Sequence, residues 1–352
     1  MKRDNTIDAL FTLVRVGLWE REVNLSDYRE INYAKLYNLS DEQGVIGLVA
    51  AGVELMSVNL PLEIKLQIVG STLQIEQRNK EMNVFIAEQV EKMRGKGIYA
   101  LLVKGQGVAQ CYEKPLWRPS GDVDYLLSDS NYVKAMEYMQ PLASASKPEG
   151  VYSKHLGLTI GQWYVELHGS LRTALSSRLD KVVDAVHYDV FYGGKVRSWM
   201  NGKTQVFLPG IDEDIFFVFS HFIKHFYKEQ LSIRQICDWC RLIWTYRDSI
   251  NHSLLESRIN KAGLMCEWRA FAAVAVNYLG MPAEAMPFYD TARKWKRKAN
   301  LVISLVFSGA KERSPKRILE LFRVFPCHTL YFLPGILKDL NFLKIKERYF
   351  SK

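Results

Sequence analysis

Long apolar runs are missing from this sequence. No uninterrupted apolar stretch reaches the roughly 18 residues of a membrane-spanning helix, so we expect no transmembrane segment. The apolar stretch near the N-terminus is interrupted by Arg15 and lacks a small-residue cleavage site, which predicts a helix rather than a signal peptide. Cysteines are also few, since five of them, an odd number, among 352 residues fit a reducing compartment. We therefore expect a cytoplasmic protein.

Cysteine chemistry has little support. Cys237 and Cys240 form a CxxC pair, but no second such pair or suitably spaced histidine pair accompanies it, which disfavours redox and zinc-binding roles. We predict that both thiols lie in the core. Core-forming residues are abundant, because 48% of the residues are hydrophobic and 24% are charged. This composition predicts a globular protein of two or three packed units.

Helical periodicity dominates from Thr6 to about Arg94. Ser40 followed by Gln43 has the spacing of a capping box and predicts the start of a helix that continues to Met56. Pro61 permits another start, and residues 62–94 have apolar side chains at spacings of three and four for about nine turns. We expect this last helix to deliver the chain to a first strand.

The most informative stretch is residues 97–127. An apolar run, Ile98 to Val103, has the length of a strand and stops at Lys104-Gly105, where we expect a turn. A second run, Asp122 to Leu127, predicts another strand. The carboxylates at its first and third positions then face the same side, because side chains alternate along a strand.

Two neighbouring carboxylates need a counter-charge. With ordinary pKa values of about 3.9, Asp122 and Asp124 are both ionised at neutral pH and repel each other unless a cation lies between them. Oxygen ligands in this arrangement suit Mg²⁺, which binds one or two protein carboxylates and completes its shell with water and phosphate. The alternative is a hydrophilic edge strand or a Gly-Asp turn, but the aspartates alternate with Val123 and Tyr125 and run into an apolar pair.

A later strand offers a third acid. Residues 150–158 and 159–169 predict a strand pair that turns near Gly161, with Glu166 and His168 on one face of the second strand. Glu166 can then lie beside the aspartate pair. The alternative is that both residues line a solvated sheet face, which is ordinary in antiparallel sheets. His168 can contact substrate, orient a carboxylate or only pack.

Two basic residues flank these acids. Lys104 ends the first strand, and Arg118 precedes the acids by four residues. Either side chain can neutralise phosphate oxygens, Arg118 as a bidentate fork and Lys104 as a point charge. Most basic side chains simply face solvent, and this remains the alternative.

These motifs point to a known family. The string KGxxxxxxY at 104–112, followed by RPSGDVDYLL at 118–127, resembles the uncharacterised nucleotidyltransferase family of the DNA polymerase beta-like superfamily. VELH at 165–168 looks like the strand of that family that holds its third carboxylate. HFIKH at 221–225, with Arg234 and Asp238, is similar to its later helical segment, so the resemblance covers roughly residues 30–280. The usual Gly-Gly or Gly-Ser phosphate loop is replaced here by KGQG at 104–107.

The resemblance implies an activity and a set of residues. The reaction moves a nucleoside monophosphate from a nucleoside triphosphate to an acceptor hydroxyl, with Mg²⁺ or Mn²⁺ as cofactor. The catalytic and metal-binding residues implied are Asp122, Asp124 and Glu166, of which Glu166 can also take the acceptor's proton. The nucleotide-binding residues implied are Lys104, Gly105, Arg118, Ser120, Gly121 and His168. The acceptor stays open: a small molecule, a tRNA or a protein fits equally.

The C-terminal half predicts further elements. Residues 182–206 are expected to be strand-rich, with turns at Gly193-Gly194 and Asn201-Gly202. Asp212 is expected to cap the following helix. On that helix His221 and His225 share a face at the spacing of metal ligands. No third ligand is apparent in the sequence, so packing or substrate lining is favoured over zinc.

Positive charge is concentrated at the C-terminal end. Residues 291–352 contain 15 Lys and Arg and 4 Asp and Glu, so the totals of 47 and 38 leave 32 and 34 for residues 1–290. The cluster at 293–317 can bind a polyanion, either nucleic acid or an anionic membrane surface. The alternative is a run of charges that only solvates a helix face.

These patterns predict an α+β protein with a small mixed β-sheet of nucleotidyltransferase type between helical N-terminal and C-terminal units. The expected boundaries are a helical unit at 1–95, a catalytic domain at 96–208, a helical unit at 209–290 and a basic helical tail at 291–352. One alternative function is a binding module that has lost its chemistry and holds nucleic acid or a protein partner through the tail. Another is a membrane-surface protein anchored by residues 316–343.

Overall fold

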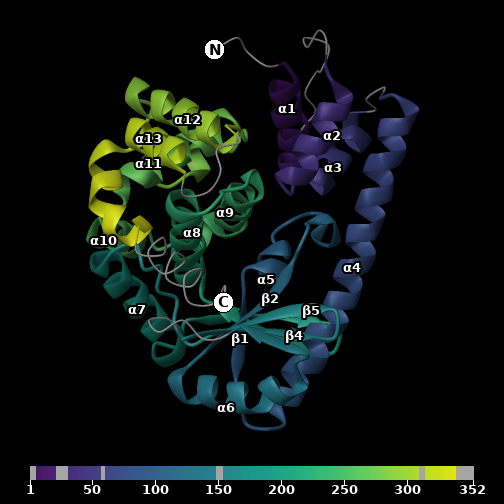
Figure 1. Cartoon of the computed structure of the whole chain (residues 1–352), viewed down its shortest axis with the longest axis vertical. Coiled ribbons are helices and arrows are strands. Elements are labelled where there is room, and N and C mark those ends of the chain that lie inside the picture. The colour runs from purple at the N-terminus through teal and green to yellow at the C-terminus, as the bar shows by residue number, and fades with distance from the viewer. Residues whose placement is uncertain (1–4, 21–30, 57–59, 148–153, 309–313, 338–352) are drawn as a thin grey trace, which may run out of the picture.

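A computed structural model of the protein describes residues 5–20, 31–56, 60–147, 154–308 and 314–337. Within these residues, helices lie before and after a seven-stranded mixed β-sheet (Figure 1). The predicted α+β fold with helical units at both ends is therefore confirmed. Every helix in the described ranges is too short or too polar to span a bilayer.

Four helices precede the sheet. They are α1 (Asn5–Trp19), α2 (Tyr33–Glu42), α3 (Ile46–Met56) and α4 (Leu62–Arg94), and α4 has the predicted bounds. The capping box predicted at Ser40 is wrong, because Ser40 lies inside α2 and its hydroxyl donates to the Tyr37 carbonyl. Asn32 is the N-cap of α2. Gly44, with a φ of 64°, turns the chain between the two helices, so α3 begins only after it.

The sheet has the strand order β3-β4-β5-β2-β1-β7-β6. The strands are β1 (Ala100–Val103), β2 (Asp122–Leu127), β3 (Ala145–Lys147), β4 (His155–Ile160), β5 (Trp163–His168), β6 (Val196–Asn201) and β7 (Thr204–Pro209). Strand β2 is antiparallel to β1 and parallel to β5, and β1 is parallel to β7. The predicted hairpin turn after Asn201 joins β6 to β7. Residues 150–153 of the predicted strand pair lie outside the described residues.

The prediction of a strand-rich segment from Val182 is wrong in its first part. Residues Ser177–Tyr192 form helix α7, and strands begin only at Val196. The buried residues of α7 recur at helical spacings: Leu179, Val182, Val183, Val186 and Val190. Ser176 caps the helix by accepting from the Leu179 amide. The segment is rich in valine, as strands are, but the helical spacing of its buried residues and the Ser176 cap favour a helix.

Short elements connect the strands, and further helices follow them. The connections are α5 (Gly105–Ala109), η1 (Pro115–Trp117), α6 (Asp129–Met139) and η2 (Gln140–Leu142). The helices after the sheet are α8 (Ile211–Lys228), α9 (Ile233–Tyr246), α10 (His252–Ala262), α11 (Met265–Asn277), α12 (Arg293–Val306) and α13 (Pro315–Val324), with single turns η3 (Arg247–Ser249) and η4 (Ala283–Ala285). Asp212 does not cap α8 as predicted. Gly210 holds that position, and the Asp212 carboxylate accepts from the Asn251 amide.

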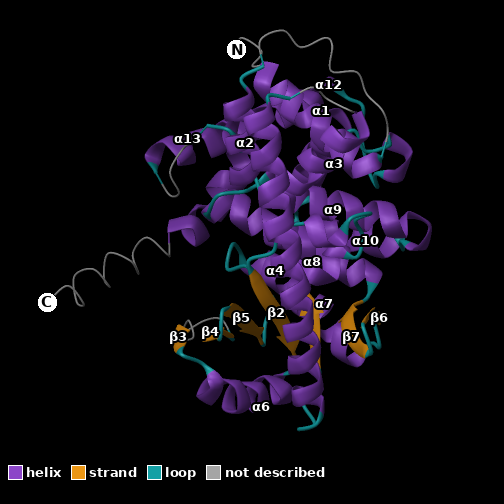
Figure 2. Ribbon diagram, turned by 90° about the vertical axis from the view of Figure 1, so that its right-hand side faces the viewer, coloured by secondary structure: helices purple, strands orange, loops and turns teal. Residues whose placement is uncertain are grey.

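Two hydrophobic cores hold these layers together. The larger one joins α1–α3 to the helices that follow the sheet, and the smaller one lies between the sheet, α6 and the second half of α4. Figure 2 shows the sheet between α6 on one side and the helical mass on the other. Helix α4 contributes to both cores, with Ile68 in the larger and Met82 in the smaller. Cys237 and Cys240 are buried in the larger core, as predicted.

Candidate active site

The predicted acidic residues meet where β2 and β5 run side by side. Asp122 and Asp124 begin β2, and the parallel register places Glu166 of β5 opposite Asp124. One carboxylate oxygen from each of the three residues lies within 4.8 Å of the others. Residues more than 40 positions apart in the chain are thus brought together by strand pairing. Three oxygen ligands at this spacing form a donor set that suits Mg²⁺.

Lys104 approaches the same carboxylates from β1. Its ammonium nitrogen lies 2.6 Å from Asp124 Oδ1, although its backbone has a φ of 55° that few side-chain-bearing residues adopt. Gly105 follows with a φ of 37°, and a Cβ there would come 3.3 Å from Ser120 Oγ. The turn that was predicted after β1 therefore bends the chain tightly enough to aim Lys104 back at β2. This ammonium offsets the negative charge of the acidic cluster.

Two histidines complete the surroundings of the carboxylates. His168 Nε2 lies 2.7 Å from Asp124 Oδ1 and 3.4 Å from Glu166 Oε2. His155 of β4 faces His168 across the strand pair, and its Nε2 lies 3.1 Å from Glu166 Oε2. The family resemblance implies nucleotide contact for His168, and none of the predicted motifs includes His155. In the structure both imidazoles contact carboxylates.

The closely spaced charges shift the pKa values of Asp122, Glu166 and Lys104. The charge of Asp124, together with burial, raises the pKa of Asp122 above its ordinary value. Burial also acts to raise the pKa of Glu166, but the contacts with the His155 and His168 imidazoles and the Lys104 charge lower it well below its usual range. Burial acts to lower the pKa of Lys104, and the three carboxylates outweigh it and raise that pKa. Glu166 and Lys104 are therefore both charged at neutral pH.

A cavity of about 140 Å³ opens onto the aspartates between β2 and the helices α8 and α9. Among the predicted nucleotide-binding residues, those that line it are Lys104, Gly105, Arg118, Ser120 and Gly121. Glu166 and His168 do not line it. The Ser120 hydroxyl is buried and has no hydrogen-bond partner within the described part of the chain. A buried polar atom without a partner is costly unless a ligand or water satisfies it.

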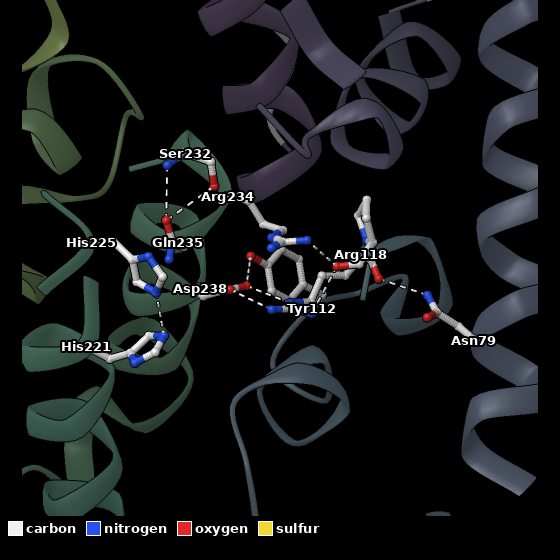
Figure 3. Close-up of polar contacts among 10 residues, drawn as sticks. Asn79, Tyr112, Arg118, His221, His225, Ser232, Arg234, Gln235 and Asp238 are labelled. Carbon is white, nitrogen blue, oxygen red and sulfur yellow. Dashed lines mark hydrogen bonds and ion pairs between the residues drawn. The ribbon is translucent and has the colours of Figure 1, made fainter. Parts of the chain in front are cut away.

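Arg118 is held on one side of this cavity by Asp238 of α9. Its Nε and Nη2 donate to the two carboxylate oxygens at 2.7 Å each, and its Nη1 donates to the Pro119 carbonyl at 3.1 Å. The Tyr112 hydroxyl donates to the same carboxylate at 2.8 Å. Figure 3 shows this buried group, with the Asn79 amide of α4 donating to the Arg118 carbonyl. Arg118 thus has a carboxylate partner inside the protein.

Arg234 also lines the cavity, although the sequence motif that contains it predicts no binding role for it. It lies one helical turn before Asp238 on α9, and its Nη1 donates to the Pro119 carbonyl at 2.9 Å (Figure 3). Its Nε is buried without a partner, and it forms no ion pair with any carboxylate of the described residues. Burial and the neighbouring Arg118 lower its pKa. The motif contained Arg234, but only the packing of α9 places its side chain in the cavity.

His221 and His225 of α8 line the opposite wall of the cavity. Their Nε2 atoms are 2.9 Å apart, and Figure 3 shows this contact between the two imidazoles. His225 Nδ1 lies 2.5 Å from Glu229. Burial and the charge of Lys104 lower the pKa of His221 well below its ordinary value. Among the residues that the structure describes, neither histidine belongs to a group of three metal-type ligands. They are cavity-lining residues that can meet a substrate.

A comparison with protein-family models finds a match, which covers most of the chain. No curated protein and no solved structure matches the chain. The family model described as uncharacterised nucleotidyltransferase matches residues 29–280, which is most of the chain and includes β2, β5 and α9. The acids, the basic residues that surround them and the helix that closes the cavity all lie in the matched region. The chain therefore belongs to the uncharacterised nucleotidyltransferase family.

Proposed function

We propose that this protein is a metal-dependent nucleotidyltransferase that moves a nucleoside monophosphate from a nucleoside triphosphate to an acceptor hydroxyl. The main support is the meeting of Asp122, Asp124 and Glu166 beside a cavity that the two aspartates and the basic residues Lys104, Arg118 and Arg234 line. Family membership supports nucleotidyl transfer in general and leaves the acceptor open. A small molecule, a tRNA and a protein side chain stay equal candidates, because specificity lies in the surrounding helices.

The donor atoms fit magnesium. Asp122 and Asp124 offer oxygens on one strand, and Glu166 adds a third from the neighbouring strand. Magnesium prefers oxygen ligands and takes substrate phosphates as part of its shell, and Mn²⁺ accepts the same ligands. When bound, the ion would neutralise the triphosphate and lower the pKa of the acceptor hydroxyl. We assign Glu166 as a metal ligand, because its carboxylate lies opposite Asp124 and within ligand spacing of both aspartates.

The basic residues divide into two roles. Arg118 has its Nε and Nη2 on Asp238, so we propose that it positions the cavity wall rather than neutralising phosphate. Arg234 and Lys104 then meet the triphosphate charge, since Arg234 has no carboxylate partner in the described ranges. The Ser120 hydroxyl, with Gly121 and the close backbone of Gly105, adds hydrogen bonds to phosphate oxygens. His168 orients Asp124 from the side away from the cavity.

A thermal-shift experiment tests this function. ATP, GTP, CTP and UTP are each added with and without Mg²⁺, and stabilisation by at least one nucleotide that needs the metal is the expected result. Asp122→Asn should remove the metal-dependent shift. Asp248→Asn, a change to an exposed aspartate on η3, should keep it. Labelled nucleotide and cell extract then identify the acceptor by what becomes labelled. Equal shifts in the two variants, or turnover that survives Asp122→Asn, would refute the assignment.

The second candidate function is a binding module. Helix α12 buries Trp295 and exposes Arg293, Lys294, Lys296 and Arg297, so four cations face outward on one short helix. Such a face can hold a polyanion without chemistry. Arg317, in contrast, is buried and donates to the Phe226 carbonyl, so it is not part of that face. Stabilisation by an oligonucleotide, with none by any nucleotide and metal, would favour this function over the enzyme.

A further inference from the structure

A second group of metal-type side chains lies on the same face of the sheet as the aspartates. His155 on β4 pairs across the strands with His168 on β5, and Glu166 lies two residues before His168. The two Nε2 atoms lie 3.1 Å and 3.4 Å from one oxygen, Glu166 Oε2. One ligand atom from each of the three side chains lies within 4.8 Å of the others. Two imidazole nitrogens thus converge on one carboxylate.

These spacings suit ligation of a common ion. Zinc binds imidazole nitrogen and carboxylate oxygen at about 2.0–2.2 Å, which separates neighbouring ligand atoms by about 3.0 Å in an octahedron and about 3.4 Å in a tetrahedron. The observed separations of 3.1 Å and 3.4 Å fall in that interval. As a hydrogen bond, the longer contact exceeds the usual N–H···O range of about 2.7–3.2 Å. The ligand atoms of the two imidazoles lie within 4.8 Å of each other, so small side-chain rotations would bring all three ligand atoms around one ion.

The donor set differs from that of the aspartates. Two imidazoles and one carboxylate favour zinc and related transition metals, whereas carboxylate and water ligands favour magnesium. Three protein ligands leave coordination positions open, which is the arrangement of catalytic rather than structural sites. The His155 side chain is 36% exposed, so a hydroxyl or water from solvent can reach an ion held there.

We propose that His155, Glu166 and His168 bind a divalent transition-metal ion of the zinc class, next to the aspartates and sharing Glu166 with the magnesium site. His168 would give up its contact with Asp124 and leave that carboxylate to magnesium. The ion's place beside a magnesium site rests on the proposed function. The binding itself does not depend on turnover. The competing explanation is that both imidazoles only position the carboxylates by hydrogen bonds.

Cobalt(II) is a suitable probe, because its visible absorption reports on its ligands. Co²⁺ is titrated into the full chain in saturating Mg²⁺, and we expect one Co²⁺ per chain. His155→Gln keeps a donor that can reach Glu166 but removes the imidazole ligand. It should weaken Co²⁺ binding by more than the 10–100-fold typical of losing a partner outside the ligand shell. His252→Gln, a change to an exposed histidine on α10, is the matched control and should bind Co²⁺ as the unmodified protein does.

A crystal soaked with Zn²⁺ locates the ion by its anomalous scattering. The proposal expects a peak within ligand distance of both Nε2 atoms. Unchanged Co²⁺ binding in His155→Gln, with an unchanged circular dichroism spectrum, would overturn it, as would a zinc peak on the aspartates alone. The two hypotheses fail separately. Bound Co²⁺ without turnover of any nucleotide counts against the enzyme, whereas turnover with Mg²⁺ and no Co²⁺ binding counts against this site.

Discussion

The pairing of Arg118 with Asp238 gives a prediction whose size follows from burial. The Arg118 side chain is 6% exposed and that of Asp238 is 9% exposed. The protein contains a second bidentate Arg–Asp pair, Arg172 with Asp184, whose side chains are 52% and 38% exposed. Its Nε and Nη2 donate to the two Asp184 oxygens at 2.8 Å and 2.6 Å, which is close to the geometry of the buried pair. The two pairs therefore differ mainly in solvent access.

The perturbation is Asp→Asn at each site. Asp238→Asn leaves the Arg118 charge buried and unpaired, and breaking one partner of a buried pair costs about 3–5 kcal/mol. The charge of Arg234 lies close to Arg118 and adds repulsion in the same direction. Asp184→Asn removes an exposed pair, for which about 0–1 kcal/mol is expected because water screens both charges. Both substitutions keep side-chain size, so packing loss does not confuse the comparison.

The assay is urea unfolding, followed by tryptophan fluorescence and circular dichroism. Free energies come from linear extrapolation, and the two signals must share one transition for the values to be compared. Asp238→Asn should lower the midpoint several times more than Asp184→Asn. Equal losses, or a loss below about 1 kcal/mol for Asp238→Asn, would show that Arg118 finds other compensation and that the pair does not hold the cavity wall.

Three further predictions follow from individual contacts. Asp122→Asn should raise the thermal midpoint of the metal-free protein at neutral pH, because a carboxyl whose pKa is raised by folding destabilises the folded state when it is ionised. The gain should begin to shrink as pH falls through the raised pKa and vanish below the ordinary pKa of an aspartate, and a gain that persists in stronger acid would contradict this reasoning. Gly70→Ala should stabilise the folded protein by up to about 1 kcal/mol, since a Cβ at that position meets no other atom within 4 Å. Gly47→Ala should destabilise the folded protein, because its Cβ would lie 2.0 Å from the Trp117 carbonyl oxygen. Urea midpoints of the two variants that move in the same direction would refute this prediction. Arg234→Met should stabilise the ligand-free protein and reduce the Mg²⁺-dependent shift with nucleotide, and an unchanged nucleotide shift would remove Arg234 from the site.

Local patterns gave the elements around the site. The apolar run before Lys104 and the alternation from Asp122 to Leu127 predicted two strands, and β2 has the predicted bounds. The spacing of apolar residues predicted α4 from end to end. Alternation also put Glu166 and His168 on one face of β5, which is half-buried at both positions. These features depend on neighbours in the chain, so the sequence is sufficient for them.

Other features depend on partners far away in the chain. The valines of α7 are equally typical of a strand. Only the spacing at which they are buried in the core shows that the segment is a helix. Arg118 lines the cavity, but its ion pair with Asp238, 120 residues later, follows from no local pattern. His155 lies on a neighbouring strand, and no spacing rule connects it to Glu166. Such pairings arise from strand register and helix packing, which one sequence does not determine residue by residue.

Helix α4 limits how the molecule can move. At about 1.5 Å per residue its 33 residues extend about 50 Å. Its first half packs in the larger hydrophobic core and its second half in the smaller one. Asn79, near its middle, also ties it to the loop that leads into β2. A hinge motion that separates α1–α3 from the sheet would have to bend helix α4. Any ligand of the cavity therefore meets a site whose shape is already set on the α4 side, with α8 and α9 forming the other wall.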